Sequence, residues 1–92
     1  MKILLIGLGS IGVRHLRNIL FLGYKNITIV SRKGVLPPEF SALSVFSSVG
    51  DALALQSFDA AIVCTPTSCH FTSVQALIKA KVQNIYIEKP VS

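Results

Sequence analysis

Acidic side chains are scarce in this chain of 92 residues, which has four Asp and Glu against nine Lys and Arg and a formal net charge of +5. No run of five or more like charges occurs, which excludes a basic tail. No basic stripe alternates with aromatic side chains, as a nucleic-acid site would require. We therefore expect no nucleic-acid partner, and a phosphorylated small ligand would suit the surplus of positive charge.

Charged residues of both signs are also few, at 14% of the chain against roughly 25% in an ordinary soluble domain. The hydrophobic share of 51% excludes a disordered chain. A chain of this length supports one core, so we expect a single domain over residues 1–92. So apolar a short chain predicts a surface that is covered by a further segment or by another subunit.

Cysteines and long apolar stretches are equally scarce. The two cysteines, Cys64 and Cys69, are too few for a disulfide framework or a zinc site. The apolar run Ile3–Ile6 is too short for a signal peptide or a membrane span, and Gly7 interrupts it. We therefore expect a cytoplasmic protein with no membrane partner and no metal.

Short β-rich runs alternate along the chain with helical patterns. Strands are expected at residues 2–6, 26–30, 42–46, 59–63 and 85–87, and residues 31–41 are expected to form a loop broken by Pro37-Pro38. Apolar residues recur at helical spacing from Ile11 up to a stop at Gly23. A second, short helix follows the capping sequence Ser48-x-x-Asp51. A third is expected from about Cys69 to Ala80, with Thr67 or Ser68 as its cap.

This alternation predicts an α/β fold of the Rossmann type, with a doubly wound parallel sheet in the strand order 3-2-1-4-5. The fifth strand would lie at an open edge, where a complete dinucleotide fold continues. We therefore expect that a C-terminal part, which would form the substrate domain, lies beyond these residues.

The sequence Gly7-Leu8-Gly9-Ser10-Ile11-Gly12 has the spacing G-x-G-x-x-G, directly after the first strand and at the start of a helix. In this context Gly7 allows a tight turn, Gly9 lets the backbone approach a pyrophosphate, and Gly12 lets helix and strand pack closely. The N–H groups and the positive dipole end of the helix would hold the phosphates. The alternative is a glycine-rich turn with no ligand.

The second strand ends where an NAD site places an acidic residue for the ribose 2′-hydroxyl, about 20 residues past the glycines. Here the sequence is Ser31-Arg32-Lys33, and no acid follows until Glu39. Arg32 can meet a 2′-phosphate as a planar fork, Ser31 can donate a hydrogen bond, and Lys33 adds positive charge. The pattern favours NADP(H), with NAD(H) as the other choice; the alternative is a solvated basic loop.

Polar residues also follow the fourth and fifth strands. Thr65-Pro66 and His70 come after the fourth strand and would border the ligand crevice. Lys89 would enter the crevice as a proton donor, and Glu88 would pair with it. An ordinary strand end and a structural histidine are the alternatives. On the first helix, we expect Arg14 and His15 to lie on a solvated face; the alternative for Arg14 is an approach to a phosphate.

The glycine motif with Arg14-His15 behind it, then T-P-T-S-C-H at residues 65–70, then E-K-P at residues 88–90, resembles the N-terminal domain of the glucose–fructose oxidoreductase, inositol dehydrogenase and rhizopine-catabolism (Gfo/Idh/MocA) family. The resemblance implies an NAD(P)-dependent oxidoreductase for sugars, cyclitols and related hydroxy compounds. It places the nicotinamide near Thr65-Pro66 with His70 in support, and gives Lys89 a part in proton transfer at the reacting hydroxyl. The family's second domain, which carries substrate contacts and the remaining catalytic residues, is absent from the sequence.

Three functions follow as hypotheses. The first is the cofactor-binding part of such an enzyme, inactive alone and meeting its small-molecule substrate only with the missing domain. The second is a non-catalytic Rossmann module that senses a nucleotide, and the third is a nucleic-acid module suggested only by the charge. We also expect a homo-oligomer formed through the exposed sheet edge.

Overall fold

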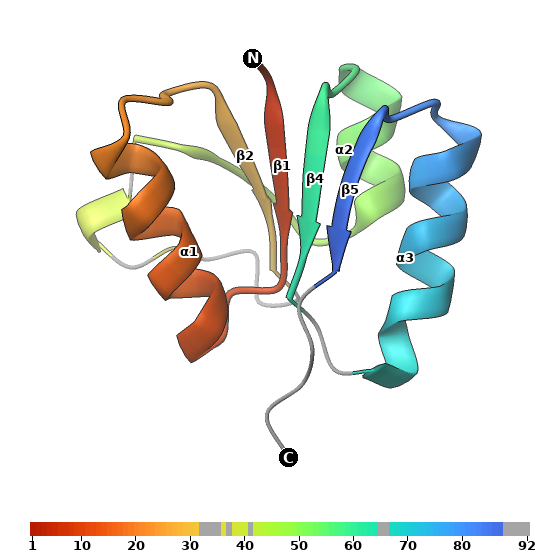
Figure 1. Cartoon of the computed structure of the whole chain (residues 1–92), viewed down its shortest axis with the longest axis horizontal. Coiled ribbons are helices and arrows are strands. Elements are labelled where there is room, and N and C mark those ends of the chain that lie inside the picture. Colours follow the sequence, from red (N-terminus) through yellow and green to blue (C-terminus); the bar gives the residue numbers. More distant parts are fainter. Residues whose placement is uncertain (32–35, 37, 41, 65–66, 88–92) are drawn as a thin grey trace.

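A computed structural model of the chain describes residues 1–31, 36, 38–40, 42–64 and 67–87, and describes only the backbone of residues 10, 11 and 67–71. Four parallel crossovers connect the strands of one sheet (Figure 1). The strands are Ile3–Ile6 (β1), Ile27–Val30 (β2), Ser44–Phe46 (β3), Ala60–Val63 (β4) and Asn84–Ile87 (β5). The helices are Ser10–Phe21 (α1), the 3₁₀ turn Pro38–Phe40 (η1), Val49–Leu55 (α2) and Thr67–Lys79 (α3).

The sheet has the strand order β3-β2-β1-β4-β5, and every strand pair is parallel, as the sequence predicts. All four residues of β1 and of β2 are buried, because both strands have a layer of side chains on each face. β1 lies between β2 and β4, with Ile6 opposite Val30 on one side and Val63 on the other. At the amino end of the sheet, the Lys2 backbone N–H donates to Asp59 Oδ2 at 2.8 Å.

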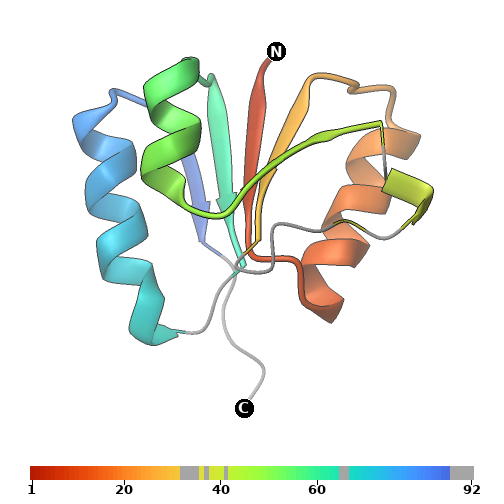
Figure 2. The ribbon, with the colours of Figure 1, turned by 180° about the vertical axis from the view of Figure 1, so that it is seen from behind.

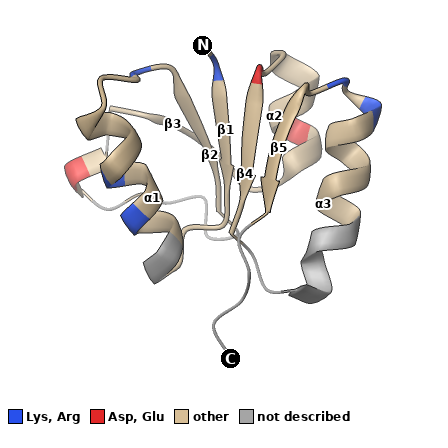
Figure 3. Cartoon of the chain, viewed as in Figure 1, with Lys and Arg blue, Asp and Glu red and all other residues tan. Residues whose placement is uncertain are grey.

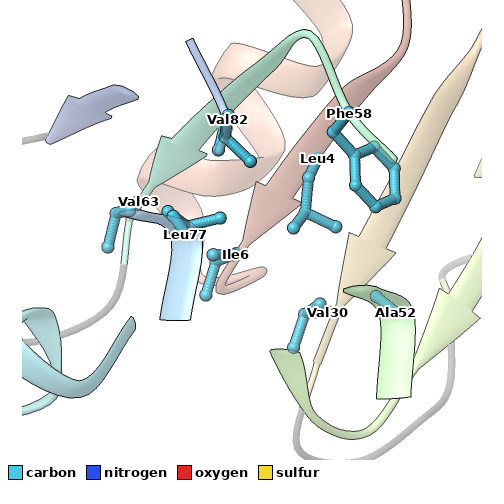
Figure 4. Close-up of a cluster of buried hydrophobic side chains, with 9 residues drawn as sticks. Leu4, Ile6, Val30, Ala52, Phe58, Val63, Leu77 and Val82 are labelled. Carbon is cyan, nitrogen blue, oxygen red and sulfur yellow. The ribbon is translucent and has the colours of Figure 1, made fainter. Parts of the chain in front are cut away.

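Two hydrophobic clusters lie on the two faces of the sheet. Residues of β1, β2 and β4 that point to one face pack against α2 and α3, with Leu77 of α3 fully buried among them (Figure 4). On the other face, Leu16 of α1 and Phe40 of η1 cover Leu5 and Ile29. Figure 2 shows the same layers from behind, with α2 and α3 on the left. Helices therefore lie on both faces, as the doubly wound fold requires.

The two halves of the sheet are unequally covered on the face that carries α1. α1 and η1 pack over the half of the sheet that contains β1, β2 and β3. In β5, Ile85 is half-buried and the other three residues are exposed. Tyr86 and Ile87 keep 58% and 44% of their surface accessible in the described structure. The far edge of the sheet thus presents apolar side chains to its surroundings.

Local signals determine where several elements begin and end. Ser48 Oγ accepts a hydrogen bond from the Asp51 N–H at 3.2 Å, which confirms the predicted cap of α2. α1 ends at Phe21, and Gly23 then takes a positive φ of 97°, a conformation that favours glycine.

Two boundary predictions were wrong. α3 begins at Thr67, about two residues before the expected start, so Thr67 and Ser68 lie inside the helix instead of capping it. The segment expected to be a loop contains η1, because a proline with its fixed φ suits the first position of a helical turn. Phe40 of this turn is buried against α1's side of the sheet.

Candidate dinucleotide-binding site

The carboxyl ends of the strands lie at one edge of the sheet, the lower edge in Figure 1, from which α1, α2 and α3 also start. The register places the last residues of β1, β2 and β4 level with one another. Hydrogen bonds continue this ladder one residue further: Gly7 N–H donates to the Val30 carbonyl at 2.9 Å, and Cys64 N–H donates to the Ile6 carbonyl at 2.8 Å. The chain leaves β1 between its two neighbours, which is where an open α/β sheet binds its ligand.

The turn between β1 and α1 depends on glycine at two positions. Gly7 has a φ of 93°, which side chains disfavour. At Gly12, an added Cβ would overlap the carbonyl oxygen of Gly7, so helix and turn approach each other more closely than any other residue permits. The tight turn and close packing that the sequence predicts are therefore present in the structure.

Gly9 differs from the other two glycines. It is the N-cap of α1, with an ordinary negative φ of −81°, and its carbonyl accepts the first helical hydrogen bond from Val13 at 2.9 Å. An added Cβ would meet no atom within 4 Å. Nothing in the described fold thus requires a glycine here, and the open space in front of its backbone fits the close approach of a pyrophosphate.

The start of α1 suits an anion. No acidic residue lies in the first turn, and no side chain caps the helix. The first N–H groups of a helix have no partner within it, and its N-terminus carries a partial positive charge. Phosphate oxygens could accept from the N–H groups of Ser10, Ile11 and Gly12, whose backbone begins this helix.

The residues that directly follow the first four strands carry no charge, and Asp51 lies in the first turn of α2. Figure 3 shows charged residues on the helices and near the amino ends of several strands. The described residues that immediately follow strands β1 to β4 are Gly7, Ser31, Ser47 and Cys64, and none of them is charged. An anionic ligand would therefore meet no repulsion from these four positions.

The end of β2 continues directly into the predicted ribose site. Ser31 is partly buried, and its N–H donates to the Phe46 carbonyl of β3 at 2.9 Å. This hydrogen bond fixes the backbone at Ser31, the residue that precedes Arg32 and Lys33 in the sequence. Those two residues lie outside the described part of the chain.

Glu39, the first acid after β2, has another partner. Arg17 Nη2 of α1 donates to Glu39 Oε1 at 2.6 Å, and both side chains are largely exposed. This hydrogen bond, aided by attraction to the carboxylate, raises the pKa of Arg17 above its usual value. The ion pair was not predicted, because the two residues lie on different elements and share no sequence pattern.

The remaining predicted residues are only partly described. Cys64, which is half-buried and in no disulfide, directly follows β4, whereas Thr65 and Pro66 lie outside the described residues. His70 lies in the first turn of α3, as expected, but only its backbone is described. Glu88 and Lys89 directly follow β5 and also lie outside the described residues, so their roles stay predictions.

The first helix contains one residue that the sequence analysis placed wrongly. His15 is half-buried instead of solvated, and its ring lies 6.3 Å from the ring of Tyr86 on β5, centroid to centroid. Arg14 is exposed, as expected. Helical periodicity could not reveal this contact, since the partner lies on the last strand of the sheet.

Among the described residues, no helix is long and apolar enough to cross a membrane. In the same part of the chain, no three His, Cys, Asp or Glu side chains gather as metal ligands would.

A parallel sheet in this order, with a glycine turn leading from its first strand into a helix N-terminus, defines a dinucleotide-binding Rossmann domain. The family described as "Oxidoreductase family, NAD-binding Rossmann fold" (GFO_IDH_MocA) matches residues 1–92. The chain belongs to this family, which the motifs of the sequence also indicate.

Individual relatives support the assignment. The 4-carboxy-2-hydroxymuconate-6-semialdehyde dehydrogenase of Sphingobium sp. is 31% identical over the whole of this chain. The solved UDP-N-acetylglucosamine 3-dehydrogenase of Acidithiobacillus ferrooxidans is 29% identical, covers 98% of this chain and superposes with a TM-score of 0.70. The scyllo-inositol dehydrogenase of Lactobacillus casei, at 24% identity and a TM-score of 0.75 over the whole chain, shares the fold. This chain spans 30%, 30% and 29% of their respective lengths.

Proposed function

We propose that this chain is the dinucleotide-binding part of an NADP(H)-dependent oxidoreductase that acts on a sugar, a cyclitol or a related hydroxy compound. The observation that carries the proposal is the turn from Gly7 to Gly12, where two glycines are required by the fold and Gly9 is not. When bound, the nicotinamide would exchange a hydride with the substrate carbon. The start of α1 would hold the pyrophosphate, and the residues after β2 would hold the adenosine ribose.

Gly9→Ala tests the binding site separately from the fold. The new methyl group would enter open space and an ordinary φ, so we expect a loss of stability below about 1 kcal/mol, from the poorer N-cap. The same methyl group would block the pyrophosphate, so we expect a loss of at least about ten-fold in dinucleotide affinity, or roughly 1.4 kcal/mol. Calorimetric titration gives the affinity and thermal unfolding gives the stability.

Gly50→Ala is the matched control, because Gly50 also has open space around its Cβ position but lies in α2. Its affinity should equal that of the wild type. Unchanged binding in Gly9→Ala would show that the glycine turn does not hold a pyrophosphate.

The preference for NADP(H) over NAD(H) rests on charge at the end of β2. The sequence there is Ser31-Arg32-Lys33, and Glu39 is engaged by Arg17 in an ion pair. A carboxylate at the ribose would repel a 2′-phosphate, whereas a guanidinium would bind it in a planar fork.

Parallel titration with NADPH and NADH tests this preference. We expect tighter binding of NADPH, and loss of that difference in Arg32→Ala, because the affinity for NADH does not depend on a 2′-phosphate contact. Arg14→Ala, which removes an exposed arginine of α1, is the control. Tighter binding of NADH by the wild type would contradict the cofactor assignment and leave the fold assignment intact.

The residues near the nicotinamide would act on the substrate. We assign proton transfer to Lys89, paired with Glu88, and support of the nicotinamide to Thr65, Pro66 and His70, on the family resemblance of these positions. The other catalytic and substrate-binding groups would come from a second domain, so the 92-residue chain alone would be inactive. A non-catalytic nucleotide sensor is the alternative, and it has no need of Lys89.

Two further properties belong to the same proposal. β5 lies at the edge of the described sheet with Tyr86 and Ile87 exposed and no charged residue in Asn84–Ile87, which suits self-association through this edge. The scarcity of cysteine suits the cytoplasm.

A further inference from the structure

His15 of α1 and Tyr86 of β5 form a ring pair across the second face of the sheet. Their centroids lie 6.3 Å apart and their planes meet at 68°, an edge-to-face geometry. Aromatic rings attract each other at this separation and angle. The contact is therefore a stabilising one between a helix and a strand that are not neighbours in the chain.

The register shows how the pair spans the sheet. Leu5 of β1 lies opposite Ile62 of β4, which in turn lies opposite Tyr86. Leu5 is fully buried beneath α1, Ile62 is half-buried, and Tyr86 is 58% exposed. α1 therefore covers the residues of this row less completely from β1 to β5. The contact of the His15 ring with Tyr86 extends this cover to β5.

β5 contacts β4, α3 and α1. It pairs with β4 along one edge, and α3 packs on its opposite face. On the face that α1 covers, the His15 ring contacts the Tyr86 ring of β5. The orientation of β5 relative to α1 should therefore depend on this ring pair.

That orientation matters because the two elements lead to different parts of the proposed cofactor site. The N-terminus of α1 would hold the pyrophosphate, at the point where the strand order reverses. β5 ends at Ile87, and the next residues in the sequence are Glu88 and Lys89, to which the proposed function assigns the nicotinamide half. The residues that follow β2, at the other side of β1, would hold the adenosine half.

We propose that His15 and Tyr86 are positioning residues, whose ring contact aligns the carboxyl end of β5 with the start of α1 and so sets affinity for the nicotinamide half of the dinucleotide. This inference rests on the proposed dinucleotide-binding function. The contact acts through β5, so the adenosine half should bind equally well without it.

The test compares a whole cofactor with a fragment that lacks nicotinamide. NADPH and 2′-phospho-ADP-ribose, and in parallel NADH and ADP-ribose, are titrated calorimetrically into the 92-residue chain. In Tyr86→Ala and in His15→Ala we expect roughly three- to ten-fold weaker binding of the whole cofactor, the range for one aromatic pair. Binding of the matching fragment should change by less than about two-fold on the same scale.

Several variants separate positioning from simple packing. Tyr86→Phe keeps the ring and should restore wild-type binding. The double variant should bind no more weakly than either single variant, since both remove the same contact. Tyr24→Ala, which removes another partly exposed tyrosine, should bind like the wild type. His15→Ala places the best helix former within α1, so the folded state of at least this variant is expected to persist.

The outcomes are distinguishable. Equal losses for cofactor and fragment, or no loss for either, would overturn the positioning role while leaving the binding function in place. Failure of the wild-type chain to bind any of the four ligands would overturn the proposed binding function, and the inference with it. Selective loss of whole-cofactor affinity in both single variants, restored by Tyr86→Phe, is the supporting result.

Discussion

At the scale of the residue, Gly12 has the most restrictive environment in the site. A methyl group there would overlap the carbonyl oxygen of Gly7, and Cys64 Cβ would lie 3.8 Å away. Backbone atoms on one side and a packed side chain on the other leave little freedom to adjust. The requirement is therefore a steric one, which exists whether or not a ligand binds.

Gly12→Ala should consequently destabilise the fold. We expect a loss of about 1–3 kcal/mol, the usual range for overpacking a close contact. Gly50→Ala supplies the contrast, because its methyl group would meet nothing within 4 Å in the first turn of α2. It should stabilise the fold by up to about 1 kcal/mol. Urea unfolding of both variants checks this, and equal stability of the two would contradict the close approach.

The sequence predicts the structure at single residues where the constraint is local. The turn at Gly7 and the close packing at Gly12 follow from glycines five positions apart, and the Ser48 cap follows from residues three positions apart. His15 and Glu39 were not predicted correctly, because their partners lie on other elements. No local pattern carries information about such contacts.

At the scale of the element, apolar runs identified every strand of the sheet and its order. The ends were less certain, since hydrogen-bond pairing decides them: β3 is shorter than its apolar run, and begins at Ser44 where it pairs with Thr28. The start of α3 was placed too late, because Thr and Ser are preferred at helix N-caps, whereas Thr67 and Ser68 here lie within the helix. The glycine turn between β1 and α1 could thus be located from the sequence, whereas the side-chain contacts around it could not.

The edge strand β5 gives a prediction of its own. Its exposed Ile87 carries no charge that would disfavour pairing with another strand. If the chain self-associates through this edge, Ile87→Lys should shift it towards the monomer in sedimentation velocity. Ile78→Lys is the control, because Ile78 is also exposed but lies on α3. A wild type that stays monomeric at high concentration, or an Ile87→Lys variant that associates equally, would contradict the proposal.

At the scale of the whole molecule, the chain corresponds to about 30% of the length of its relatives. We propose that this part binds the phosphates and the adenosine half of a dinucleotide. If the remaining catalytic groups lie in another domain, the 92-residue chain should bind a dinucleotide but reduce no NADP⁺ in the presence of a polyol. Absorbance at the wavelength of the reduced nicotinamide checks this. Turnover by the chain alone would show that no second domain is needed.

The bond between Lys2 and Asp59 joins residues separated by 57 positions in the sequence. It marks the central pairing of β1 with β4, and no strand in this sheet pairs with its neighbour through a short hairpin. During synthesis on the ribosome, β1 is made first but cannot be enclosed until β4 has left the exit tunnel. Its four apolar side chains remain in water for that interval, when a growing chain is most prone to aggregate. The order of the strands in the sheet thus sets how long β1 stays exposed while each new molecule is synthesised.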